Sequence, residues 1–123
     1  MASPPTSHWP RLTDLFVESE AQVALLGAPM AEGSVTPGRC RLAPGTIRQS
    51  LRRFTPYDVV TGEELGVRLR DAGDVPLEGV MPTEGFEPIR DAVARCISAH
   101  HLTLLLGGNN AVTRPAAHGL GVP

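Results

Sequence analysis

An α/β layered fold with a mostly parallel sheet is predicted, because short apolar runs alternate with segments of helical spacing. Residues 23–27 form an apolar run, the pattern of a strand buried on both faces, and residues 102–106 form a second apolar strand. Residues 67–72 alternate roughly between apolar and polar side chains, and predict a third strand that closes in Gly73-Asp74.

A helix is predicted for residues 44–54, after a long Gly/Pro-rich loop over residues 28–43. Pro44 falls in its first turn, where a missing N–H costs nothing. Its apolar face would be formed by Ile47, Leu51 and Phe54.

The clearest helix covers residues 88–99, with Pro88 near its start. Residues 78–85, before it, are interpreted as a Pro/Gly-containing connection. Residues 111–118 begin a third helix, with Pro115 in its first turn.

Residues 1–22 are assigned to an N-terminal arm and a lead-in helix, and residues 23–123 to the α/β domain. Residues 1–7, which contain Pro4-Pro5, are expected to be a disordered or loosely docked arm. Apolar side chains at a helical spacing predict the short lead-in helix over residues 9–17.

Composition argues against several classes of partner. The net charge of −2 and the pI near 6.0 indicate no surface for nucleic acid or for an anionic membrane. No apolar run approaches the length of a membrane span, and no secretory leader is recognisable. A cytoplasmic protein is therefore expected. Cys40 and Cys96 lack metal-binding spacing, and unpaired thiols are favoured over a disulfide between them.

Three loops follow the carboxyl ends of the predicted strands, where parallel sheets build their active sites. They begin at Ala28, at Ala72-Gly73-Asp74 and at Gly107-Gly108-Asn109-Asn110. A functional site is therefore expected where these three loops meet.

The same loops resemble those of the arginase, agmatinase and formimidoylglutamase family, the ureohydrolases. Residues 25–30 (LLGAPM) are similar to the family's L-G-x-P, and residues 41–48 (RLAPGTIR) to a later stretch in which a proline opens a helix before I-R. Residues 71–75 (DAGDV) are similar to D-x-G-D-V, and residues 106–115 (LGGNNAVTRP) to L-G-G-D-H-S-x-T-x-P. The motifs occur in the family's order, so the resemblance covers nearly the whole chain from Val23.

This resemblance implies a three-layer α/β/α fold and a site for two manganese ions, whose bridging hydroxide attacks a guanidinium or formimino carbon. It further implies a metal-dependent hydrolase of linear amidine or guanidine C–N bonds, of the formimidoylglutamase, agmatinase or arginase type. Its substrate would be a small guanidino or formimino molecule, and a homo-oligomer is expected.

Asn110 occupies the position of the family's first histidine ligand, and Asn109 that of the preceding aspartate. The resemblance therefore makes Asn110 a candidate metal ligand and Asn109 a candidate for substrate binding, while no catalytic residue is assigned. The family's later ligand motifs, Asp-Ala-His-x-Asp and Asp-x-Asp, have no counterpart here. The chain is thus expected to form the N-terminal portion of a ureohydrolase domain, and to be inactive alone.

Each candidate also has a structural interpretation. Asn109 and Asn110 could cap the following helix, and Gly107-Gly108 could simply allow a tight turn. An Arg–Asp brace within the loop layer is favoured for Arg39 and Arg48, and a structural role in capping or bracing the loop backbone for Asp74. A partly exposed connection is favoured for His100-His101. The alternative function is a non-catalytic ureohydrolase-like module that binds a ligand or serves a structural role.

Overall fold

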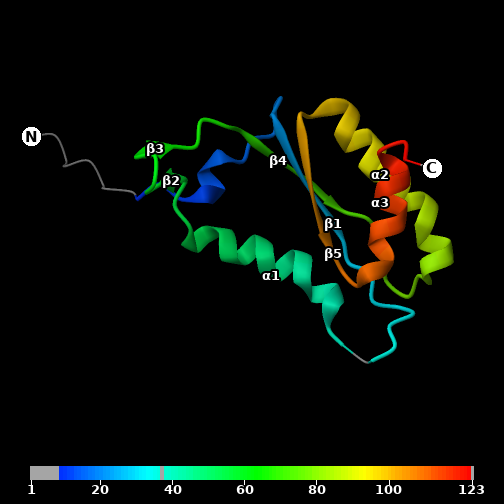
Figure 1. Cartoon of the computed structure of the whole chain (residues 1–123). Helices are drawn as coiled ribbons and strands as arrows, with labels where there is room; N and C mark the ends of the chain where they lie inside the picture. Colours follow the sequence, from blue (N-terminus) through cyan, green and yellow to red (C-terminus); the bar gives the residue numbers. More distant parts are fainter. Residues whose placement is uncertain (1–8, 37, 123) are drawn as a thin grey trace, which may run out of the picture.

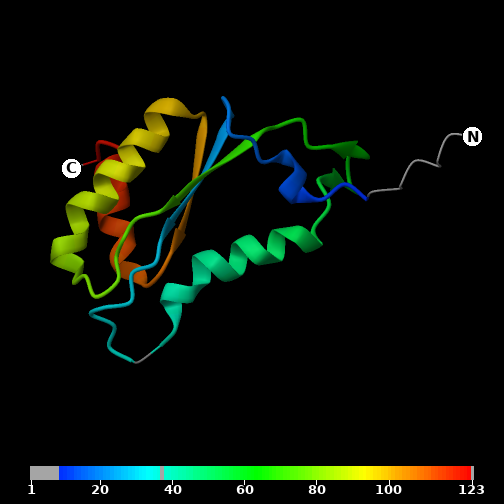
Figure 2. The same cartoon turned by 180° about the vertical axis from the view of Figure 1, so that it is seen from behind.

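The computed structural model describes residues 9–36 and 38–122. A three-stranded parallel sheet lies between helix α1 (Ala43–Ser50) on one side and helices α2 (Pro82–Ala99) and α3 (Thr113–Gly119) on the other (Figures 1 and 2). The predicted α/β fold with a parallel sheet is confirmed. The arm predicted for residues 1–7 lies outside the described residues.

Strand β1 (Val23–Ala28) is central, between β4 (Leu69–Asp74) and β5 (Leu102–Gly107). Both neighbours run parallel to it, with Val23 opposite Leu69 on one side and opposite Leu102 on the other. Every residue of β1 is buried, as its apolar run predicts. Strand β5, although equally apolar, is an outer strand, and Leu102 is 54% exposed and Leu104 41%.

Helix α2 buries its predicted apolar stripe but is longer than predicted, whereas α1 ends at Ser50 and leaves Ile47 of its predicted apolar face exposed. Helix α2 begins at Pro82, so Pro88 lies inside it, and the interpretation of residues 82–85 as a connection is wrong. Gly85 lies inside this helix, where glycine is locally unfavourable. A Cβ at this position would lie 2.5 Å from the Met30 Cε, so the packing favours the smallest residue. Pro82 starts the helix where no N–H is needed.

Short 3₁₀ helices extend the other two α-helices, α1 and α3. Helix α1 is flanked by Cys40–Leu42 and Leu51–Arg53, and α3 is preceded by Asn110–Val112. Pro115 lies in the first turn of α3, as predicted.

The predicted lead-in helix is only a 3₁₀ turn, Leu12–Leu15. Beyond it, Phe16 forms a parallel bridge with Leu69, and the Val17 N–H donates to the Leu69 carbonyl at 2.8 Å. This segment therefore covers the beginning of β4. A small antiparallel hairpin, β2 (Tyr57–Asp58) with β3 (Glu63–Glu64), was not predicted, since two-residue strands carry no alternation to detect.

The main core lies between the sheet and α2. It is aliphatic, as the low aromatic content requires, and is composed of Ala24, Leu26, Ala28, Met30, Val75, Leu77, Ile89, Ala92, Val93, Cys96 and Val112. Within residues 9–36 and 38–122, no helix is both long and apolar enough to cross a membrane.

Candidate functional site at the carboxyl ends of the strands

The three expected loops do meet at one edge of the sheet. The Val75 N–H, just after β4, donates to the Gly27 carbonyl at 2.9 Å. On the other side of β1, the Asn109 N–H donates to the Met30 carbonyl at 2.9 Å. The end of the central strand is thereby tied to the loops of both neighbours.

Gly108 makes the closest backbone approach in this region. Its φ is +48°, and a Cβ at this position would lie 2.5 Å from the Ala28 carbonyl oxygen and 2.6 Å from the Met30 nitrogen. Only glycine leaves room for this contact, and its positive φ is unfavourable for other residues. The tight-turn interpretation of Gly107-Gly108 is therefore correct, and the turn also locks the β5 loop against the β1 loop.

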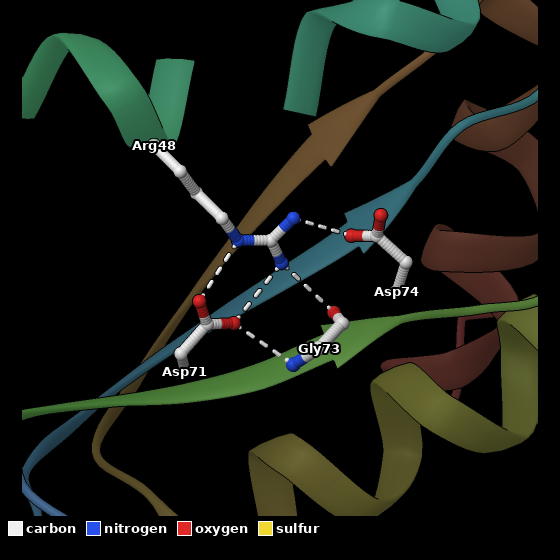
Figure 3. Close-up of polar contacts among 4 residues, drawn as sticks. All are labelled: Arg48, Asp71, Gly73 and Asp74. Carbon is white, nitrogen blue, oxygen red and sulfur yellow. Dashed lines mark hydrogen bonds and ion pairs between the residues drawn. The ribbon is translucent and has the colours of Figure 1, made fainter. Parts of the chain in front are cut away.

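Arg48 of α1 joins the helix to the end of β4 (Figure 3). Its Nε and Nη2 donate to the two carboxylate oxygens of Asp71 at 2.9 and 3.0 Å, and Nη1 donates to Asp74. Nη2 also donates to the Gly73 carbonyl at 3.0 Å. The predicted Arg–Asp brace is confirmed for Arg48, whereas Arg39 is exposed and makes no ion pair with a described residue.

Two consequences follow from this brace. Partial burial alone would lower the pKa of Arg48, but the hydrogen bonds to Asp74 and Asp71 outweigh it and raise the pKa above the ordinary value, so Arg48 stays a cation. Asp74 also fills the space beside Gly27, where any Cβ would collide with its carboxylate. Asp74 is thus a structural residue, with its charge already paired.

Asn109 is anchored by every polar atom of its side chain. Its Oδ1 accepts the Ala111 N–H at 3.1 Å, which caps the turn that leads into α3. Its Nδ2 donates to the Glu32 carbonyl at 3.1 Å and to the Ser34 hydroxyl at 3.0 Å. These contacts match the capping interpretation and add a tie to the β1–α1 loop.

Asn110, by contrast, is exposed, and its side chain has no hydrogen-bond partner among the described residues. Its amide oxygen is a hard donor that suits Mn²⁺. The described part of the chain, however, contains no group of three or more His, Cys, Asp or Glu side chains that could hold a metal. One neutral amide does not make a metal centre, so these residues do not fit a two-manganese site by themselves.

The remaining candidates have structural roles or none. The Nδ1 of His100 lies 2.8 Å from the Cys96 carbonyl at the end of α2, and His101 is exposed, so the interpretation of a connection is correct. Cys40 and Cys96 are both free thiols, as predicted. Sequence reasoning missed Cys40 at this site, where its Sγ donates to the Met30 carbonyl at 3.4 Å. No local signal marks it, because it follows an aperiodic loop.

Comparisons with known proteins agree with this architecture. Residues 21–122 match the model of the Arginase family. The formimidoylglutamase of Bacillus subtilis (strain 168) is 28% identical over 110 residues, which are 84% of this chain and 34% of that protein.

Solved structures are similar over the same part of the chain. The formimidoylglutamase structure from Bacillus subtilis has a TM-score of 0.81 at 23% identity, covering 98% of this chain and 40% of that one. Trypanosoma cruzi formiminoglutamase with Mn²⁺ gives 0.77 at 23% identity, covering 92% and 40%. Proclavaminate amidino hydrolase from Streptomyces clavuligerus gives 0.76 at 21% identity, covering 97% and 41%. The chain therefore has the fold of these proteins and spans well under half of their length.

Proposed function

Because this chain belongs to the arginase family, we propose that it forms the amino-terminal part of a metal-dependent hydrolase of linear amidine C–N bonds, nearest to the formimidoylglutamase type. The substrate would be a small formimino or guanidino compound. The proposal includes manganese, a homo-oligomeric assembly and a cytoplasmic location, with neither nucleic acid nor membrane as partner. Manganese is included because the Trypanosoma cruzi formiminoglutamase structure contains it.

One observation carries this proposal: Asn110 is exposed and has no side-chain hydrogen bond to a described residue, on a loop that its neighbours Gly108 and Asn109 hold in place. Gly108 holds the loop against β1, and the Asn109 side chain holds it against Glu32 and Ser34. A side chain presented by a rigid loop at the carboxyl edge of a parallel sheet is well placed to bind a ligand.

In this proposal each residue has a separate task. Arg48 positions the β4 loop, Asn109 positions the β5 loop, and Asn110 offers its amide oxygen to a hard cation. When bound, the metal would supply an activated water. Further ligands would have to come from outside the described residues, which contain no group of three or more His, Cys, Asp or Glu side chains that could hold a metal.

The second candidate is a non-catalytic, ureohydrolase-like module. It is favoured by the neutral amide of Asn110 and by the pairing of Asp71 and Asp74 with Arg48, which leaves neither carboxylate free for a metal.

Product formation decides between the two candidates. We would incubate the 123-residue chain, and in parallel any longer product of the same reading frame, with Mn²⁺ and N-formimino-L-glutamate, agmatine or arginine, and measure formamide and urea. The chain alone should form no product, whereas the longer protein should release formamide. Asn110→Ala should lower that rate at least roughly tenfold, because a ligand to the metal is lost. Gln49→Ala removes an exposed amide from α1 and is the matched control. If the longer protein bound Mn²⁺ tightly but formed no product from any of the three substrates, the non-catalytic module would be supported and the hydrolase excluded.

A further inference from the structure

A concave surface lies away from Asn110, between the outer edge of β4 and helix α2. This β4–α2 groove is open to solvent and has a volume of about 530 Å³. Its floor is apolar and is formed by Leu26, Val75, Ala92 and Cys96, which are all buried. A cavity of this size can hold a small organic molecule.

The acidic residues that line the groove already have partners. Asp71 and Asp74 are bound to Arg48, which approaches them from the α1 side (Figure 3). Asp91 is paired with Arg90 at 2.9 Å. None of these three carboxylates is therefore free to neutralise another cation in the groove.

Two arginines in the same lining have no such partner. Arg70 of β4 and Arg95 of α2 are both exposed, and neither side chain makes an ion pair or a hydrogen bond with any other described residue. Arg95 lies on the stripe of α2 that faces the groove, one turn from Asp91 and from Ala99.

The two guanidinium groups act on the same point of the floor. Burial raises the pKa of the Cys96 thiol, and the positive charges of Arg95 and Arg70 both oppose that rise. Both arginines, which line the groove, therefore act electrostatically on Cys96 in its apolar floor.

We propose that the β4–α2 groove binds a small organic oxyanion, a carboxylate or phosphate ester, with the anionic group between Arg70 and Arg95 and the carbon chain on the apolar floor. Guanidinium groups bind carboxylate and phosphate oxygens through paired N–H donors. The apolar floor selects an anion that carries hydrocarbon over an inorganic one. This site is independent of Asn110 and of the proposed hydrolase.

Calorimetric titration of the complete chain at constant ionic strength tests the proposal. The probes are propionate, hexanoate, inorganic phosphate and butyl phosphate, which separate the anionic group from the carbon chain and carboxylate from phosphate. One site per chain is expected. Hexanoate should bind roughly tenfold more tightly than propionate, because its three additional methylenes reach the floor. Equal affinity for these two probes would overturn the assignment of the floor.

Matched variants locate the site. Arg70→Gln and Arg95→Gln should each weaken hexanoate binding at least roughly tenfold, whereas Arg53→Gln, an exposed arginine outside the groove, should leave it unchanged. Equal weakening in all three variants, non-saturating binding, or no binding by the folded wild-type chain would each overturn the proposal.

A second measurement uses the unaltered sequence. Hexanoate should slow alkylation of Cys96, which lies in the floor, and leave alkylation of Cys40 unchanged. Equal protection of both thiols, or protection of neither, contradicts the site.

Discussion

The two outer strands of the sheet flank the same central strand, yet they expose opposite kinds of surface. From Arg70 onward β4 is exposed and carries charge, its pairing with β1 is interrupted by a bulge, and the segment at Phe16 and Val17 covers its beginning. Strand β5 instead exposes Leu102 and Leu104 to solvent. One strand is thus charged and irregular, whereas the other is apolar and regular.

This difference indicates which edge of the sheet is finished, that is, protected from pairing with a further strand, and which edge is unfinished. Charged side chains and bulges keep an edge strand from pairing with further strands, and β4 has both. Strand β5 has the apolar composition of a strand with neighbours on both sides, and the hydroxyl of Thr103 is buried there without a partner in the described part of the chain. Helix α1 and its 3₁₀ extension add to the uncovered surface, since Ile47 is 39% exposed and Phe54 59%. We therefore expect β5 to be covered in the assembled protein.

The carboxyl ends of both strands are nevertheless locked, and the largest effect is expected at β5. Gly108→Ala should lower the free energy of unfolding by about 3 kcal/mol. A Cβ there would clash with the Ala28 carbonyl and the Met30 backbone, and alanine disfavours the positive φ. Chemical denaturation measures the loss.

Gly45→Ala is the matched control, because a Cβ at this position in α1 has nothing within 4 Å. It should stabilise the chain by up to about 1 kcal/mol, since alanine is the better helix former. A loss of less than about 1 kcal/mol for Gly108→Ala would mean that the two loops are not in close contact.

At the end of β4, Arg48→Ala should cost about 1–2 kcal/mol. It leaves Asp71 and Asp74 side by side without their cation, but the site is half open to water, so the cost stays below that of a buried pair. Arg48→Lys should recover only part of the loss, because one ammonium group cannot replace the guanidinium fork. Arg53→Ala, an exposed arginine near the same helix, should change stability by less than about 0.5 kcal/mol.

The pH dependence of this pair has a definite sign. The pKa of Arg48 is raised above its value in the unfolded chain, so its contribution to stability is fully present below the unfolded pKa and is lost only above the folded pKa. The difference between wild type and Arg48→Ala should therefore be constant between about pH 6 and 9. A steady decrease of that difference across this interval would show that another group controls the brace.

The elements that could be predicted are those with a local signal. Strand β1 is an unbroken apolar run, and its burial depends on little else. The start of α2 could not be predicted, because Gly85 and Pro88 oppose a helix locally, and the contact of Gly85 with Met30 becomes visible only in the fold. The composition of β5 does not indicate which strands flank it, so its place at the edge of the sheet becomes visible only in the fold.

The features of the candidate site also divide into those with a sequence signal and those without one. The place of the loops and the brace by Arg48 follow from motifs and from complementary charge. The anchoring of Asn109 depends on Glu32 and Ser34, from a loop without periodicity, so no sequence pattern indicates it. Two adjacent asparagines thus have different surroundings, which their identity alone could not reveal.

That contrast gives a smaller prediction for the end of β5. Asn109→Ala should cost about 1 kcal/mol, because it removes a cap and two hydrogen bonds to the β1–α1 loop. Asn110→Ala should change stability by less than about 0.5 kcal/mol, since its side chain contacts no described partner through hydrogen bonds. Thermal or chemical unfolding of both variants measures the two losses of stability. If the losses were equal, Asn110 would have a structural role as well.

The smallest change in stability is expected on the exposed face of β5. Leu104→Thr should alter the free energy of unfolding by less than about 0.5 kcal/mol, because the side chain is 41% exposed and threonine suits a strand. Its effect should appear instead as weaker self-association of the chain in sedimentation velocity, since an apolar contact on the unfinished edge is removed. Ala72→Thr places the same side chain on exposed β4 and should leave association unchanged. If Ala72→Thr reduced association as much as Leu104→Thr, both edges would be equally open, and the distinction between a finished and an unfinished edge would be wrong.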